Sequence, residues 1–102
     1  MSFRILRTER FGEALRQILF YIADNAQDSA PALQLLDEIE EATCSLADFP
    51  NRGAKPRDRH LRALGYRYLK VKSYLLFYFC SEDTVCMLMI VHEKQAYRDL
   101  LK

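Results

Sequence analysis

The chain has 102 residues, of which 50% are hydrophobic and 28% are charged, and its formal net charge is +1. This length and composition predict one globular domain spanning residues 1–102, and they exclude a disordered chain. No apolar stretch approaches the roughly 20 residues that span a bilayer, and the first residues lack a long apolar region of the signal-peptide kind. We therefore expect a cytoplasmic protein with no membrane partner.

The first elements are a short strand and an amphipathic helix. Residues 3–6, FRIL, favour a strand, and Thr8 then offers an N-cap oxygen. Apolar residues recur at steps of four, three and four, which predicts one buried stripe of a helix that ends near Asp24. The stripe consists of Phe11, Leu15, Ile18 and Ile22.

A second helix is expected to begin at Ser29, with Pro31 in its first turn, and to end at Pro50. Because about four residues join the two helices, they should form an antiparallel hairpin that covers one side of a sheet. The apolar face of the second helix comprises Ala32, Leu35, Ile39, Ala42, Leu46 and Phe49.

The second half of the chain is predicted to be mostly strands. Residues 51–60 favour an exposed basic loop, and residues 61–74 alternate as in a strand with one solvent-facing side. Residues 75–80 and 85–92 predict two buried strands joined by a hairpin turn, and residues 93–102 can form one or two helical turns. The predicted fold is α+β, with the order β-α-α-β-β-β-α. An N-terminal strand and an antiparallel two-helix hairpin pack on a small antiparallel sheet, and a short C-terminal helix follows.

Charge is segregated along the chain. Residues 24–48 contain seven acids and no Lys or Arg, whereas residues 52–72 contain eight bases and one acid. Two explanations are open: acidic and basic elements pack beside each other, or a basic face docks an anionic partner, either nucleic acid or an acidic protein segment.

The cysteines and histidines predict neither a disulfide framework nor a metal site. Cys44, Cys80 and Cys86 are odd in number and have no C-x-x-C spacing. Buried free thiols are favoured over a Cys80–Cys86 pair facing across the turn. No histidine–carboxylate cluster has ligand spacing, and His60 has no identifiable partner in the basic loop, so we expect no metal and no cofactor.

Three segments of the chain resemble a known family. They are YIADNAQDSAPALQLLDEIEEATCSLADFPNRG, LRALGYRYLKVKSYLLFYF and MIVHEKQAYRDLL. In this order and spacing they are similar to the RelE/ParE superfamily of bacterial type II toxin–antitoxin toxins, and the resemblance extends from about Phe3 to Leu101. It implies a helical hairpin on a small antiparallel sheet. It also implies a cognate antitoxin that wraps a partly disordered segment around the toxin, and contact with operator DNA only through that antitoxin.

The resemblance leaves two activities open. RelE-like toxins cleave mRNA on the ribosome, whereas ParE-like toxins poison DNA gyrase and have no known nuclease chemistry. Under the nuclease alternative, His92 would transfer a proton, Lys94 would hold phosphate with Arg67 and Lys70, and Tyr97 would donate a proton or stack on a base. Simpler roles are a hydrogen-bonded structural His92, a solvated Lys94 and a Tyr97 that anchors the last helix.

One departure favours the ParE-like branch. RelE-like nucleases resemble one another in an arginine three residues before the tyrosine of their central strand, and this chain has Leu75 there, in LLFY. We therefore expect a binding module, with the nuclease as the alternative. Its target- or antitoxin-binding face is predicted to comprise Arg57, Arg59, Arg62, Arg67, Lys70 and Lys72.

Overall fold

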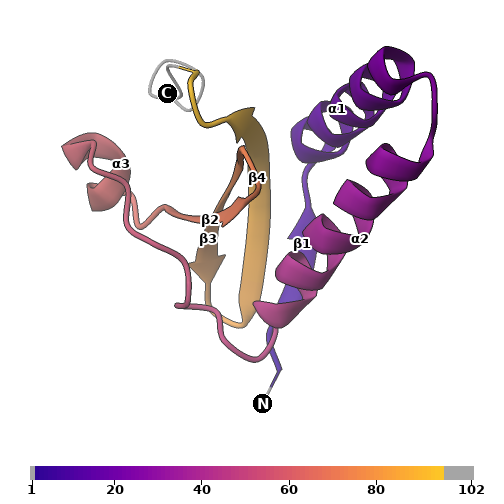
Figure 1. The fold of residues 1–102 in the computed structure, drawn as a ribbon. Helices are drawn as coiled ribbons and strands as arrows, with labels where there is room; N and C mark the ends of the chain where they lie inside the picture. Colours follow the sequence, from indigo (N-terminus) through magenta and orange to yellow (C-terminus); the bar gives the residue numbers. More distant parts are fainter. Residues whose placement is uncertain (1, 96–102) are drawn as a thin grey trace.

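The computed structural model describes residues 2–95. A helical hairpin lies on one side of a four-stranded sheet, and a short third helix lies on the other side (Figure 1). The helices are α1 (Glu9–Ala26), α2 (Ala30–Ser45) and α3 (Arg59–Ala63). The strands are β1 (Arg4–Arg7), β2 (Arg67–Val71), β3 (Tyr74–Ser81) and β4 (Thr84–His92). The α+β class and the order of the first six predicted elements are confirmed.

The sheet is mixed, which corrects the prediction of an antiparallel sheet. Its strand order is β1-β4-β3-β2, and β1 pairs in parallel with β4, with Ile5 opposite Val85. Two-residue turns join β2 to β3 and β3 to β4, so these pairs are antiparallel as expected. After β1 the chain continues into the helical hairpin and not into a tight turn. β1 can therefore pair in parallel with β4, a strand distant in the sequence. The two central strands are β3 and β4, the two segments that were predicted to be buried strands.

The predicted apolar stripe of α1 is confirmed. Phe11 is fully buried, and Leu15, Ile18 and Ile22 pack against the main core with Leu35 and Ile39 of α2. Thr8 caps α1, because its Oγ1 accepts a hydrogen bond from the Phe11 N–H at 3.1 Å.

The start of α2 matches the prediction, with Ser29 at the N-cap and Pro31 in the first turn, but the capping bond and the helix end differ. Ser29 precedes the helix but makes no side-chain capping bond; Asp28 Oδ1 instead accepts from the Ala30 N–H at 3.1 Å. The helix ends at Ser45 rather than at Pro50, because the following amides bond to carbonyls three residues back and tighten the last turn. Leu46 is buried as expected, but Phe49 is 67% exposed and does not belong to the core.

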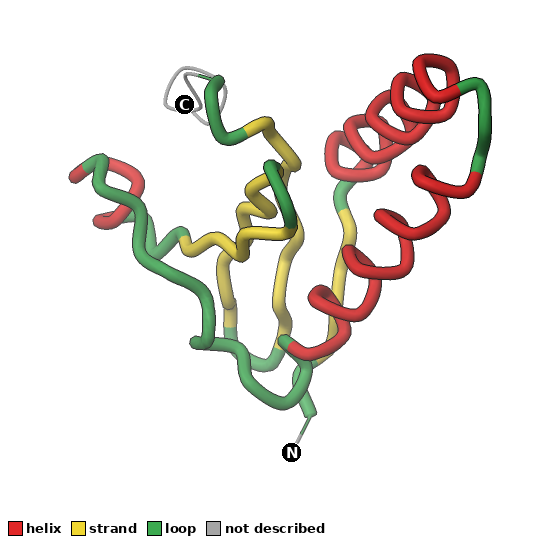
Figure 2. Tube along the Cα trace, viewed as in Figure 1, coloured by secondary structure: helices red, strands yellow, loops and turns green. Residues whose placement is uncertain are grey.

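Two further parts of the prediction need correction. The segment expected to be a basic loop and a long alternating strand contains α3, whose N-cap Asp58 accepts from the Leu61 N–H (Figure 2). The cysteines are free, but Cys44 and Cys80 are exposed and Cys86 is half-buried, so the expectation of buried thiols is wrong. Cys80 lies opposite Val85 rather than Cys86. The C-terminal helix was predicted within residues 93–102: residues 93–95 form a turn and a bend, and residues 96–102 lie outside the described part of the chain.

Candidate functional site

His92 closes β4 and organises the turn that follows. Its Nδ1 accepts a hydrogen bond from the Lys94 N–H at 3.2 Å, and its own backbone N–H donates to Gln95 Oε1 at 2.8 Å. Its ring stands edge-on to Tyr74, with centroids 5.5 Å apart. These contacts hold the His92 ring at the turn after β4. Lys94 is exposed beside it, and Tyr97 lies outside the described residues.

The sheet surface around Leu75 is apolar. Leu75 is 7% exposed and forms a second core cluster with Leu61 of α3, Phe77 and Val91. Tyr66, Tyr68 and Met89 pack around this cluster. The helix α3 therefore covers the position at which RelE-like nucleases carry arginine. Replacing Leu75 by a cation would place a charge within this apolar cluster, which costs free energy.

Three of the six predicted basic-face residues are held by contacts within the protein. Arg67 is half-buried, and its Nη1 donates to the carbonyls of Asn51 at 3.2 Å and Gly53 at 2.9 Å. Lys70 Nζ lies 2.9 Å from Glu93 Oε2. This hydrogen bond, with the attraction between the charges, raises the pKa of Lys70 and lowers the pKa of Glu93. Lys72 Nζ lies 3.6 Å from Glu38 Oε2.

The remaining three bases lie on α3 or just before it. Arg57, Arg59 and Arg62 are exposed, and within residues 2–95 no hydrogen bond or ion pair holds their guanidinium groups. Such groups are available to an anionic partner without first breaking an internal contact. The structure therefore divides the predicted basic face into a restrained part on β2 and a free part at α3.

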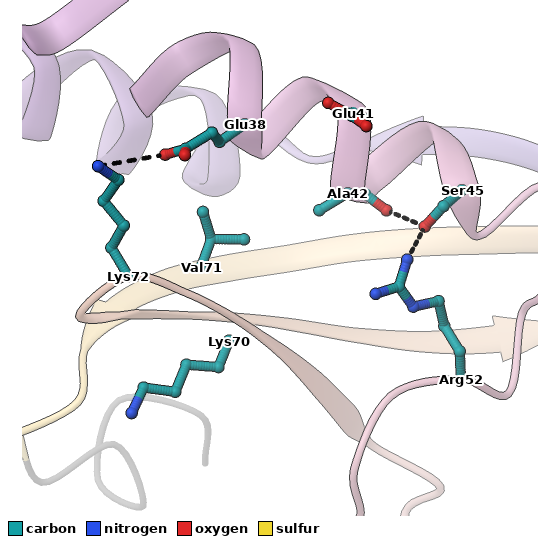
Figure 3. Close-up of a pocket in the computed structure, with 8 residues that line it drawn as sticks. All are labelled: Glu38, Glu41, Ala42, Ser45, Arg52, Lys70, Val71 and Lys72. Atoms are coloured by element: carbon teal, nitrogen blue, oxygen red, sulfur yellow. Dashed lines mark hydrogen bonds and ion pairs between the residues drawn. The ribbon is translucent and has the colours of Figure 1, made fainter. Parts of the chain in front are cut away.

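A groove of about 310 Å³ between α2 and β2 shows where the acidic and basic segments meet (Figure 3). Glu38 extends from α2 toward Lys72, whereas Lys70 points away from the helix. Arg52 Nη1 donates to Ser45 Oγ at 2.6 Å, and that hydroxyl donates to the Ala42 carbonyl at 2.6 Å. Packing of acidic against basic elements thus accounts for part of the charge segregation.

The prediction missed several residues near these bases. Arg52 bridges the loop to α2, while Lys55 and Tyr66 line a separate pocket with Arg62 and Arg67. Arg52 and Lys55 belong to the basic run of residues 52–72, but only a folded loop shows which elements they face. In residues 2–95 no three His, Cys, Asp or Glu side chains gather as metal ligands, and none of the described helices is long and apolar enough to cross a membrane.

Comparisons with known proteins agree with this architecture. A family model described as the ParE toxin of the type II toxin–antitoxin system parDE matches residues 5–97. The fold is similar to a solved structure of the chromosomal ParDE system from P. aeruginosa. The TM-score is 0.70 and the identity 16%, over 89% of this chain and 96% of that chain. It is also similar to the RelBE2 toxin–antitoxin complex from Mycobacterium tuberculosis. Here the TM-score is 0.60 and the identity 21%, over 90% of this chain and 99% of that chain. No curated protein gives a significant match.

Proposed function

Because the chain belongs to the ParE toxin family of type II toxin–antitoxin systems, we propose that it arrests growth by binding DNA gyrase. It acts as a binding module, without catalytic chemistry of its own. The observation that carries this proposal is the burial of Leu75 in the apolar cluster under α3.

RNA cleavage requires several groups placed together. Attack of a 2′-hydroxyl on phosphorus needs a proton acceptor, a proton donor and cations around the developing negative charge. Around Leu75 the sheet offers Phe77 and Val91, and α3 offers Leu61, while the nearby Lys70 is already paired with Glu93. His92 uses Nδ1 to accept the Lys94 N–H. These features favour recognition of a protein target over cleavage.

We further propose that a cognate antitoxin neutralises this toxin. Both solved structures to which the fold is similar are described as toxin–antitoxin systems or complexes. The free arginines Arg57 and Arg59 suit acidic side chains of a protein partner, either the antitoxin or the target.

The proposal is tested by inducing the chain in bacteria while DNA synthesis and translation are followed separately. We expect DNA synthesis to stop first and primer extension to show no toxin-dependent cuts in mRNA. A His92→Ala, Lys94→Ala double variant should arrest growth as strongly as the unchanged chain, with its folding checked by thermal melting. Cuts in mRNA that appear on induction and disappear in the double variant would refute the proposal and support a nuclease.

A further inference from the structure

A second pocket lies at the opposite end of β3 from Leu75. The pairing of β2 with β3 begins at Arg67 opposite Tyr78, so Phe79, Cys80 and Ser81 have no partner in β2. A pocket of about 400 Å³ opens where β3 continues beyond the last residue that pairs with β2. It is lined by Asn51, Lys55, Arg62, Gly65, Tyr66, Arg67 and Cys80.

Three cations from three different segments converge on this pocket. Lys55 comes from the loop before α3, Arg62 from α3 and Arg67 from β2. None of the described residues that line it is acidic, in contrast to the groove between α2 and β2, where Glu38 and Glu41 face the bases. The cations here are therefore not neutralised by carboxylates in the pocket wall.

The Arg67 guanidinium is already positioned for a ligand. Its Nη1 is held by the Asn51 and Gly53 carbonyls, which fixes the plane of the group and leaves its other N–H donors uncommitted to these bonds. A guanidinium fixed in this way loses little side-chain entropy when it binds an anion, and its planar fork matches phosphate oxygens.

The pocket also has an aromatic wall. Tyr66 stacks on Phe79, with ring centroids 5.9 Å apart and planes inclined by 29°. Aromatic side chains beside a cationic groove are the usual means of holding nucleic acid bases without sequence preference. The volume lies within the roughly 300–1,000 Å³ of small-molecule sites.

We propose that this pocket binds a nucleotide unit, with its phosphate on Lys55, Arg62 and Arg67 and its base against Tyr66. The ligand is either a free nucleotide or one unit of a single strand. An acidic peptide fits less well, because its carboxylates would use the cations but not the aromatic wall. Cys80, in the pocket wall, lies five residues along β3 from Leu75, about 16 Å at roughly 3.3 Å per residue, so this end of the site is distant from the His92 turn. The proposal does not depend on gyrase being the target.

Cys80 makes the proposal measurable, since this exposed residue lines the pocket. Its sulfur is partly buried and lies 3.7 Å from the Pro50 carbonyl oxygen. The purified chain would be treated with iodoacetamide in alkaline buffer, because burial raises the pKa of Cys80, and alkylation of each cysteine would be followed by mass spectrometry. The probes are AMP, an eight-residue oligothymidylate, inorganic phosphate and a glutamate-rich peptide, at matched ionic strength. We expect AMP or the oligonucleotide to slow alkylation of Cys80 but not of Cys44, which lies on α2 outside the pocket.

The four probes give distinct answers. Stronger protection by the oligonucleotide than by AMP identifies a strand as the ligand, and equal protection identifies a single nucleotide; either result supports the proposal. If inorganic phosphate protects as well as AMP, the base has no role and the proposal is wrong. Equal protection by the glutamate-rich peptide, or no protection by any probe, also overturns it.

A matched pair of variants tests the assignment of residues. Lys55→Ala with Arg62→Ala removes two exposed cations from the pocket and should raise the half-protecting concentration at least about tenfold. Arg57→Ala with Arg59→Ala removes the same charge from the same surface outside the pocket and should have a much smaller effect. Equal effects of the two pairs would show that only general surface charge attracts the anion.

Discussion

At the scale of single residues, Tyr78 ties the sheet to the loop that precedes α3. Its side chain is fully buried; its hydroxyl accepts from the Gly53 N–H at 2.9 Å and donates to the Pro50 carbonyl at 2.9 Å. The two partners approach so closely that a Cβ added to Gly53 would lie 2.5 Å from the hydroxyl oxygen. Because Arg67 bonds to the same loop, Tyr78 also fixes the wall of the proposed nucleotide pocket.

Tyr78→Phe should lower the free energy of unfolding by about 1–3 kcal/mol, because a buried N–H and a buried carbonyl lose their partner. Urea denaturation provides the measurement. Tyr21→Phe is the matched control, since Tyr21 is 67% exposed, and it should change stability by less than about 0.5 kcal/mol. A Tyr78→Phe chain as stable as the unchanged chain would contradict this role.

The Tyr78 hydroxyl should also make the free energy of unfolding depend on pH. Burial raises the pKa of Tyr78 above its ordinary value of 10.0, so the folded state holds the proton more tightly than the unfolded state. The resulting stabilisation is fully present below pH 10 and is lost as the pH rises through the folded-state pKa. Unfolding free energies measured across this range should fall for the unchanged chain and fall less for Tyr78→Phe.

At the scale of elements, the start of α1 depends on an irregularity in β4. Phe77 pairs with Met89 and Tyr78 with Met87, so Leu88 is an extra residue in β4. Thr8 Oγ1 donates to the Leu88 carbonyl at 3.0 Å and itself accepts from the Phe11 N–H at 3.1 Å. Thr8 thus fixes the angle at which the helical hairpin leaves the sheet.

Thr8→Ala should destabilise the chain by about 0.5–2 kcal/mol, because the Phe11 N–H loses its cap and the Leu88 carbonyl loses its donor. Ser29→Ala is the control, since Ser29 makes no capping bond, and it should cost much less. Chemical denaturation of both variants decides the point. If both variants lost the same free energy of unfolding, the two Thr8 hydrogen bonds would contribute nothing measurable.

Local signals predicted most elements, and long-range contacts explain the errors. The Thr8 cap, the α1 stripe and the central strands β3 and β4 were predictable from spacing and alternation. The parallel pairing of β1 with β4 was not, because it joins segments about 80 residues apart. The short α3 was missed for a related reason: it is stabilised by burying Leu61 under the sheet, and no periodicity shows over five residues.

At the scale of the whole molecule, the acidic run of residues 24–48 includes α2, and the basic run of residues 52–72 includes α3 and β2. The sequence predicted a basic face, but only the structure separates Lys70 and Lys72, which are paired with carboxylates, from the free arginines at α3. It also shows that Leu75 faces an apolar cluster, where sequence alone indicated only a missing arginine. The partners that would bind the free arginines are other molecules, so the sequence of this chain alone does not identify them.

We propose that this toxin acts on gyrase through binding rather than on RNA through chemistry. The most direct test of this claim is a supercoiling assay with relaxed plasmid, ATP, purified gyrase and increasing amounts of the purified chain, with translating ribosomes treated in parallel. We expect supercoiling to fall with toxin concentration while the mRNA on the ribosomes stays intact. Unchanged supercoiling together with cut mRNA would contradict the claim.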